Sequence, residues 1–202
     1  MTLMKFVNQR NYPHWLYPTC VERDGELKEN GKTTTVASSG CGLCCSVMVA
    51  HRLIPNCDFE LLDALNLSFA VKANHGKGTD FRRYIPAFAE KLNLDFQFSQ
   101  DIEDVLQCVR TGGAAIALVA GDRDGQVGLF THIGHYIVVI NEEPDGRLAI
   151  LDPNFYDGKF EESGREGKVE ITYGNLALCS KDVLAEEAKA HTGISYYIFR
   201  RK

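Results

Sequence analysis

Residues 38–53 read SSGCGLCCSVMVAHRL, three small residues followed by an apolar run that is ended by Ile54-Pro55. A small polar start and a proline just beyond the end are typical limits of a helix. Apolar side chains cover nearly the whole circumference of the segment from Cys41 to Leu53, which favours burial in the core. The sequence therefore predicts a buried helix whose first residue is Cys41.

Cys41 stands at the start of this helix, between Gly40 and Gly42. The N–H groups of a first helical turn have no partner inside the helix, and the helix dipole places partial positive charge there. Such an environment favours thiolate over thiol and lowers the pKa of a cysteine. The two glycines leave room for a substrate carbonyl, and nearby backbone N–H groups suit an oxyanion hole. Cys41 is thus a candidate nucleophile, with Gly40 and Gly42 as candidate substrate-binding residues; the alternative is a small, unreactive residue.

Two further thiols compete with Cys41. The effect of the helix end fades within the first turn, so we expect Cys44 and Cys45 to pack in the core. Cys41-x-x-Cys44 at a helix start is also the arrangement of thioredoxin-like redox enzymes. In those enzymes a strand of a parallel sheet runs directly into the helix, and residues 32–40 (KTTTVASSG) could form such a strand. A thiol-disulfide oxidoreductase is therefore the alternative function. No second cysteine or histidine pair has zinc-ligand spacing, so no metal site and no cofactor are predicted.

The rest of the chain changes from helical to β-type patterning. Residues 19–35 are polar and contain the turn dipeptides Asp24-Gly25 and Asn30-Gly31, which favours a loop or loose hairpin. A helix is predicted at 79–92, with Thr79 as its expected N-cap, and Pro86 inside it predicts a kink or a broken start. Further helices are predicted at 58–70, 101–110 and 181–190, and strands at 94–98, 114–120, 135–141, 147–152 and 195–200.

Helices that come first and strands that come later indicate an α+β fold with a mainly antiparallel sheet. We expect one domain, 1–202, in which a helical part (about 36–112) carries the nucleophile helix. This part packs on a sheet part (about 113–202).

His135 opens a strongly apolar strand, and Asp152 ends the next one. The linking residues 142–146 (EEPDG) are good turn chemistry for a hairpin. If the turn centres on Pro144-Asp145, position 137 lies opposite Asp152, and His135 lies diagonally across on the same face. A three-residue turn would reverse this parity. Thiolate, imidazole and carboxylate together meet the requirements of thiol hydrolysis.

Each of these assignments has an alternative. His135 could be a strand-end residue facing water, and Asp152-Pro153 could be a common strand-ending turn. Asn154 could orient the imidazole in place of Asp152, because an amide oxygen also accepts from a ring N–H. His75 and His132 fall in loops.

Composition excludes several classes of protein. The chain has 202 residues, is 45% apolar and 24% charged, and carries a net charge of −5, which argues against binding of nucleic acid through its phosphates. No apolar stretch approaches the roughly 20 residues of a membrane helix, and the first residues lack the apolar segment of a secretory signal. Seven cysteines without regular spacing favour reduced thiols over a disulfide framework. We therefore expect a cytoplasmic protein that does not bind membranes.

Three motifs resemble the pattern of the C39-like peptidases, a family of the papain-like cysteine peptidase superfamily. They are Gly40-Cys41-Gly42 at the start of an apolar helix, His135-Tyr136-Ile137-Val138-Val139 on a later strand, and Leu151-Asp152-Pro153 after the following strand. Their order and intervals agree with the family's, and the similarity runs from Phe6 to about Phe160.

The resemblance implies a papain-like fold and a bacterial-type cysteine peptidase that acts on a peptide or protein substrate. Cys41 would attack a carbonyl, His135 would protonate the leaving group and then activate water, and Asp152 would orient His135. In the family, a glutamine upstream of the nucleophile can donate to the oxyanion hole, which makes Gln9 a candidate; its other interpretation is a surface residue on a first strand. Gly134, next to His135, is a further candidate substrate-binding residue.

The chain departs from the family at several positions. Leu43 stands where proline is frequent, and Cys44 and Cys45 stand where small residues are frequent. Thr35 occupies the place of a glutamine found in the leader peptidases fused to exporters, so cleavage of exporter leader peptides is not expected. A non-catalytic peptide-binding module of the same fold is the remaining alternative. Specificity is expected to lie in the loops 19–35, 71–80 and 121–134.

Overall fold

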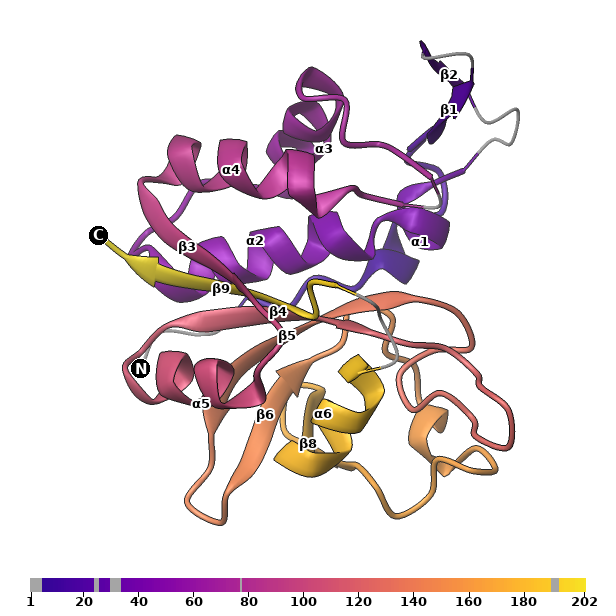
Figure 1. Ribbon diagram of the computed structural model, residues 1–202, viewed down its shortest axis with the longest axis vertical. Coiled ribbons are helices and arrows are strands. Elements are labelled where there is room, and N and C mark those ends of the chain that lie inside the picture. Colours follow the sequence, from indigo (N-terminus) through magenta and orange to yellow (C-terminus); the bar gives the residue numbers. More distant parts are fainter. Residues whose placement is uncertain (1–4, 24–25, 30–33, 77, 190–192) are drawn as a thin grey trace.

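The computed structural model describes residues 5–23, 26–29, 34–76, 78–189 and 193–202. Helices cover both faces of a central sheet, giving three layers (Figure 1). Within the described residues, no helix combines the length and the apolar character needed to cross a bilayer. All seven cysteines lie in the described segments and are free thiols.

Seven strands form the main sheet, in the order β3-β9-β4-β5-β6-β8-β7, and neighbouring strands are antiparallel. The sheet places the strand that comes last in the chain between two earlier ones. The strands are β3 (Leu94–Ser99), β4 (Ala114–Val119), β5 (His135–Glu142), β6 (Arg147–Leu151), β7 (Glu170–Thr172), β8 (Leu176–Ser180) and β9 (Tyr196–Arg201). A separate hairpin pairs β1 (Cys20–Arg23) with β2 (Glu26–Glu29).

The antiparallel sheet, the strands at 94–98, 114–120, 135–141, 147–152 and 195–200, and the hairpin within 19–35 agree with prediction. The turn dipeptides Asp24-Gly25 and Asn30-Gly31 lie outside the described residues. Strands β7 and β8 were not predicted. Strand β7 has three residues and is largely exposed, so its sequence carries no clear alternation of apolar and polar residues.

The predicted helices are present, with changes at their ends. They are α2 (Cys41–Leu53), α3 (Leu61–Ala70), α4 (Phe81–Leu92), α5 (Ile102–Arg110) and α6 (Lys181–Lys189). The expected last residue of the 181–190 helix lies outside the described residues. Helix α3 begins at residue 61 rather than 58, because Glu60 is its N-cap and Asp63 accepts the backbone N–H of Glu60 at 2.9 Å.

The start of α4 also differs from prediction. Asp80, not Thr79, is the N-cap, and its carboxylate accepts from the N–H of Arg82 at 3.0 Å. The Thr79 hydroxyl instead bonds to the hydroxyl of Tyr17. Pro86 lies inside one continuous helix, so the expected broken start is wrong.

A short helix, α1 (Val36–Ser39), precedes α2, and Gly40 separates the two. The segment before α2 is therefore helical where a strand was considered. Gly40 is the N-cap of α2 and supplies no capping side chain, so no side chain at the N-cap occupies the first-turn N–H groups beside Cys41.

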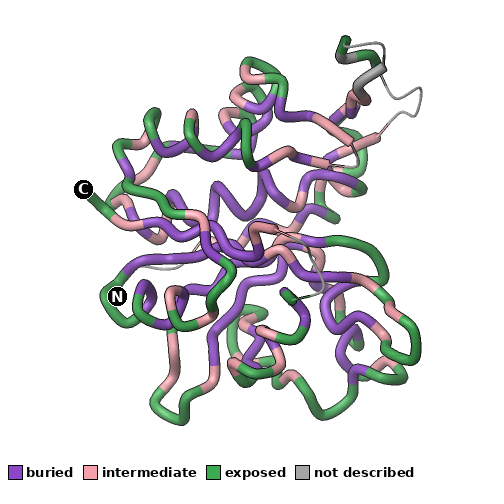
Figure 2. The backbone as a smooth tube through the Cα atoms, in the orientation of Figure 1, coloured by how far each residue is buried: buried purple, intermediate pink, exposed green. Residues whose placement is uncertain are grey.

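Two apolar cores lie on opposite faces of the sheet, which explains why β4 and residues 137–140 of β5 are apolar. Helix α2 is buried almost all round, between the sheet and the helices α3 and α4 (Figures 1 and 2). Helices α5 and α6 pack on the other face. The predicted grouping of residues 101–110 with the nucleophile helix is thus wrong, because α5 covers the face opposite α2.

The β5–β6 hairpin contains a turn of three residues, 144–146, between Glu143 and Arg147. By itself, this turn would place Val138 opposite Asp152 and His135 on the other face. An extra residue in β5, at the bulge between Val139 and Asn141, restores the predicted parity.

Beyond this bulge, Val139 pairs with Ile150 and Val138 with Leu151. Position 137 therefore lies opposite Asp152, as predicted, although the assumed turn was wrong.

Candidate active site

The three predicted catalytic residues come from three different elements. Cys41 is the first residue of α2, His135 is the first residue of β5, and Asp152 follows β6 directly. Helix α2 packs against β5, which brings the start of the helix to the start of the strand. The fold therefore places a thiol, an imidazole and a carboxylate at one end of the sheet.

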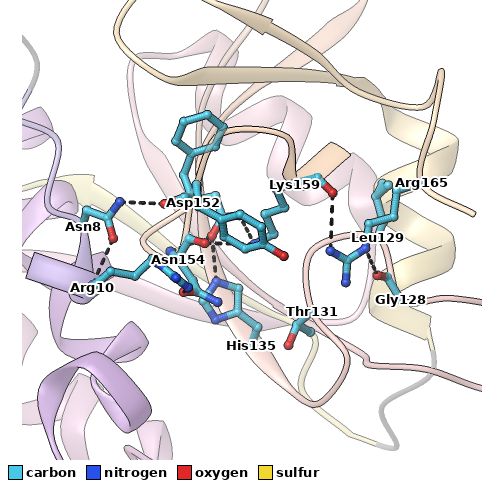
Figure 3. Close-up of polar contacts among 12 residues, drawn as sticks. Asn8, Arg10, Gly128, Leu129, Thr131, His135, Asp152, Asn154, Lys159 and Arg165 are labelled. Carbon is cyan, nitrogen blue, oxygen red and sulfur yellow. Dashed lines mark hydrogen bonds and ion pairs between the residues drawn. The ribbon is translucent and has the colours of Figure 1, made fainter. Parts of the chain in front are cut away.

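His135 and Asp152 are buried and in direct contact, with His135 Nε2 2.8 Å from Asp152 Oδ1 (Figure 3). Because Asp152 takes Nε2, the ring leaves Nδ1 for Cys41. Burial alone would lower the pKa of His135, but hydrogen bonds and charge from Asp152 and Cys41 raise it to about 9. The imidazolium is thus the favoured form near neutral pH.

The Cys41 thiol is half-buried. Burial raises its pKa, but the hydrogen bond and charge of His135 and the backbone N–H groups of Tyr136 and Gly42 outweigh burial. The pKa of Cys41 therefore lies below its usual value. A low thiol pKa beside a high imidazole pKa favours a thiolate–imidazolium pair.

Asp152 uses both carboxylate oxygens. Oδ1 accepts from His135 and from the backbone N–H of Asn154 at 2.8 Å, and Oδ2 accepts from Lys159 Nζ at 2.5 Å. Burial raises the pKa of Asp152, but His135 and Lys159 lower it to about 2. The side-chain oxygen of Asn154 instead accepts from Arg10 at 3.3 Å. Of the two candidates, Asp152 is therefore the residue that contacts the imidazole.

Lys159 was not singled out in the sequence. Its side chain is fully buried, with 1% of its surface exposed. Lysines are almost never buried unless paired, so a single lysine between loop residues carries no signal of burial. Only the folded chain brings it to Asp152.

A cavity of about 520 Å³ opens beside Cys41 and His135. Gly134, a predicted substrate-binding residue, lines it, whereas Gly40 and Gly42 do not. A Cβ at Gly42 would lie 2.7 Å from the Phe81 ring, and a Cβ at Gly40 would lie 2.6 Å from Val36 Cγ1. These two glycines are therefore explained by close packing rather than by room for a substrate.

Gln9 also lines the cavity and is 5% exposed. It lies in the 3-10 helix η1 (Gln9–Asn11), so the interpretation as a surface residue on a strand is wrong. Its Nε2 donates to the Ala37 carbonyl at 2.7 Å, and its backbone N–H donates to Pro153 at 2.7 Å. An amide NH₂ has two hydrogens, so one N–H of Gln9 remains for a ligand.

Two of the three expected specificity loops border this cavity. His75 and Gly78 belong to the loop 71–80, and Thr131, His132 and Ile133 belong to the loop 121–134. The described part of the loop 19–35 contributes no lining residue.

Arg165 contacts the loop 121–134 with its buried side chain. This side chain donates to the Gly128 carbonyl at 2.9 Å (Figure 3) and to His132 Nε2 at 3.1 Å. His132 therefore donates from Nδ1 to Asp122, which lies 3.0 Å away. The sequence offered no sign that Arg165 and His132 would meet.

The competing thiols lie in the core. Cys44 and Cys45 are fully buried, and burial together with the charge of Cys41 raises the pKa of each. A helix, not a strand, precedes α2, and the paired strands of the main sheet are antiparallel. The thiol-disulfide oxidoreductase alternative is therefore not favoured.

Comparison with known proteins adds evidence on the fold. No family model and no curated protein matches the sequence. A solved structure from Bacillus anthracis, provisionally described as a C39-like peptidase, matches with a TM-score of 0.55. The match covers 100% of this chain and 96% of that chain, at 11% sequence identity. The two chains share a fold. The expected C39-like architecture is thereby confirmed for the fold alone.

Proposed function

We propose that this protein is a cysteine hydrolase that cleaves a peptide or amide bond with Cys41 as nucleophile. The supporting observation is the buried contact of 2.8 Å between His135 and Asp152, beside a thiol whose pKa is lowered at the start of a helix. The C39-like fold agrees with this chemistry. The positive charge of His135 that pairs with the Cys41 thiolate is expected to persist up to about pH 9.

The reaction takes place in two stages. The Cys41 thiolate attacks the substrate carbonyl carbon, and a C–S bond forms. The C–N bond then breaks, and the Nδ1 proton of His135 passes to the leaving amine. In the second stage His135 takes a proton from water, the resulting hydroxide attacks the thioester, and the acid product leaves as the thiolate returns.

Gln9 is the proposed side-chain donor to the oxyanion. Gln9 borders the cavity that holds Cys41, its amide has a second hydrogen besides the one donated to Ala37, and the first-turn N–H groups of α2 lie at the Cys41 end of the helix. Such donors stabilise the negative oxygen of the tetrahedral intermediate.

Substitution of the thiol tests the proposal. We expect Cys41→Ala to lower hydrolysis of a fluorogenic peptide mixture by roughly 10³-fold or more, because the attacking group is lost. Cys44→Ala is the matched control on the same helix, and we expect it to keep most of the activity since Cys44 is buried in the core.

The result can also contradict the proposal. If both variants hydrolyse the peptides at the wild-type rate, Cys41 is not the nucleophile. The binding-module alternative is tested with a cysteine-directed acyl probe at pH 6. We expect wild-type Cys41 to be acylated and His135→Ala to remain unlabelled; an unlabelled wild-type protein would favour binding without catalysis.

A further inference from the structure

The ammonium of Lys159 lies in the interior, behind Asp152. Its Nζ is 2.5 Å from Asp152 Oδ2 and 3.3 Å from the Asn154 carbonyl oxygen, and it lies 5.7 Å from the centre of the Tyr156 ring (Figure 3). Asp152 thus stands between two cationic groups, His135 on one oxygen and Lys159 on the other. A buried lysine is costly unless its charge is matched, so this arrangement requires an ionised Asp152.

The local chain holds Lys159 in this position. Lys159 opens the 3-10 helix η2 (Lys159–Glu161), after Gly158 with a φ of 80°. The next residue, Phe160, is buried against Phe130, with ring centroids 5.6 Å apart. The apolar anchor and the left-handed glycine fix the direction of the lysine stem toward Asp152.

We propose that Lys159 is a positioning residue, which keeps Asp152 oriented and charge-balanced while His135 gains and loses its proton. This role rests on the proposed hydrolase function. In the resting state, imidazolium and ammonium both face Asp152. When His135 gives its proton to the leaving amine, a carboxylate without Lys159 would be left as an unpaired buried charge.

The proton transfer therefore depends on Lys159. Without this cation, Asp152 would stabilise the imidazolium more strongly, and His135 would release its proton less readily. Lys159 also holds Oδ2, so the carboxylate cannot turn away from the ring while Oδ1 is bound by His135 and Asn154.

Other charged groups lie near this cluster, among them Arg10, which donates to the Asn154 side chain and lies over the Tyr156 ring. Arg165 and Glu162, which face Lys159, pair with each other at 2.8 Å. The groups of α2, β5 and the N-terminal segment that face Cys41 or Asp152 have pKa values that burial raises above their usual range, which favours their neutral forms. These neutral groups are Cys44, Cys45, Tyr17 and Tyr136.

The test measures the rate of Cys41 alkylation by iodoacetamide from pH 3 to pH 10, followed by mass spectrometry of the Cys41 peptide. The reactive ion pair has an acid limit, where the thiolate forms, and an alkaline limit, where His135 loses its proton. Removing a nearby positive charge raises the pKa of both groups. We expect both limits of Lys159→Met to move upward by about one pH unit, whereas Lys159→Arg keeps the charge and moves them little.

Lys168→Met is the matched control, because Lys168 is exposed and its Nζ bonds to the Gly164 carbonyl, away from Asp152. We expect its profile to equal that of the wild type. If Lys159→Met does not fold, Lys159→Gln removes the charge but keeps a hydrogen-bond donor for Asp152, and the same upward shift is expected.

Unchanged limits in a folded Lys159→Met or Lys159→Gln variant would overturn the role of Lys159, even if the overall rate fell. Failure of the hydrolase proposal has a different signature. In that case wild-type Cys41 would react as an ordinary thiol, with one rise near its usual pKa and no reactive plateau at pH 6.

Discussion

Asp152 couples the charges of the candidate site to the stability of the fold. Its folded pKa of about 2 lies below its usual 3.8, so its ionisation stabilises the fold above pH 4. This stabilisation is lost as the pH falls from about 4 to about 2. We expect the free energy of unfolding to drop by roughly 2 kcal/mol over this range because of this one carboxylate.

Urea unfolding of the wild type and of Asp152→Asn at pH 5, 3 and 2 measures this effect. The variant is less stable at every pH because Lys159 is left without its counter-charge. Its loss of stability below pH 4 is expected to be smaller than that of the wild type. If both proteins lost the same stability between pH 5 and pH 2, the contacts of Asp152 with His135 and Lys159 would not be what lowers its pKa.

The residues that the sequence could predict were those whose neighbours along the chain create the signal. Cys41 is at the start of an apolar helix, His135 is at the start of an apolar strand, and Asp152 is at the end of one. Each of these groups therefore contrasts with the apolar residues next to it in the sequence. Lys159 and Arg165 stand in polar loops, where burial depends on contacts with distant segments. Gln9 likewise contacts distant segments, through its bonds to the carbonyls of Pro153 and Ala37.

Among the elements, the β5–β6 hairpin has one residue without a partner on the facing strand, Ile140 at the bulge in β5. Beyond the bulge, Val139 already pairs with Ile150, so deletion of Ile140 leaves a regular ladder and keeps position 137 opposite Asp152. Deletion of Ile150 instead moves Asp152 one place along β6 and onto the other face. Both isoleucines are buried, so the two deletions remove similar apolar surface.

Alkylation of Cys41 at pH 6 distinguishes the two deletions. We expect the protein without Ile140 to retain the fast reaction, with a loss of about 1–3 kcal/mol in stability from the missing buried side chain. The protein without Ile150 is expected to react as an ordinary thiol. The opposite order of reactivity would mean that the bulge itself, rather than the register beyond it, places His135.

Element prediction succeeded where the pattern was long and local. Helix α2 has its predicted limits because a glycine and a proline bound thirteen consecutive helical residues. The register of the β5–β6 hairpin was harder to predict. The three-residue turn changes which residues face each other, the bulge in β5 changes it back, and neither feature is visible in the apolar pattern. Strand β7 is short and largely exposed, so no periodicity identifies it.

Across the whole molecule, Arg165 connects the segment after η2 to the loop that borders the cavity. We expect Arg165→Met to loosen the loop 121–134, because the Gly128 carbonyl and the His132 ring both lose their donor. Hydrogen exchange followed by mass spectrometry should show faster exchange across 121–134.

Lys168→Met again provides the control, since this exposed residue lies in the same segment as Arg165. Exchange at wild-type rates in Arg165→Met would mean that the loop is held by its other contacts, such as the bond from the Leu129 N–H to Glu187 at 2.8 Å.

The arrangement of the layers was the part least open to prediction. The α+β class follows from helices that precede strands, but the face on which each helix packs depends on the sheet order. The apolar sequences of β4 and β5 predicted strands, without showing that helices cover both faces of the sheet and that α5 and α6 cover one of them.

Strand β9, at residues 196–201, lies between β3 and β4 in the sheet. Both of these strands come much earlier in the chain, at residues 94–99 and 114–119. A nascent chain that has not yet passed residue 201 through the ribosome holds β3 and β4 with no strand to join them. Helix α2 rests partly on β9, so its support is incomplete until that moment. Until residues 196–201 have been synthesised, the sheet beneath α2 is therefore incomplete, and so is the packing that holds Cys41 in place.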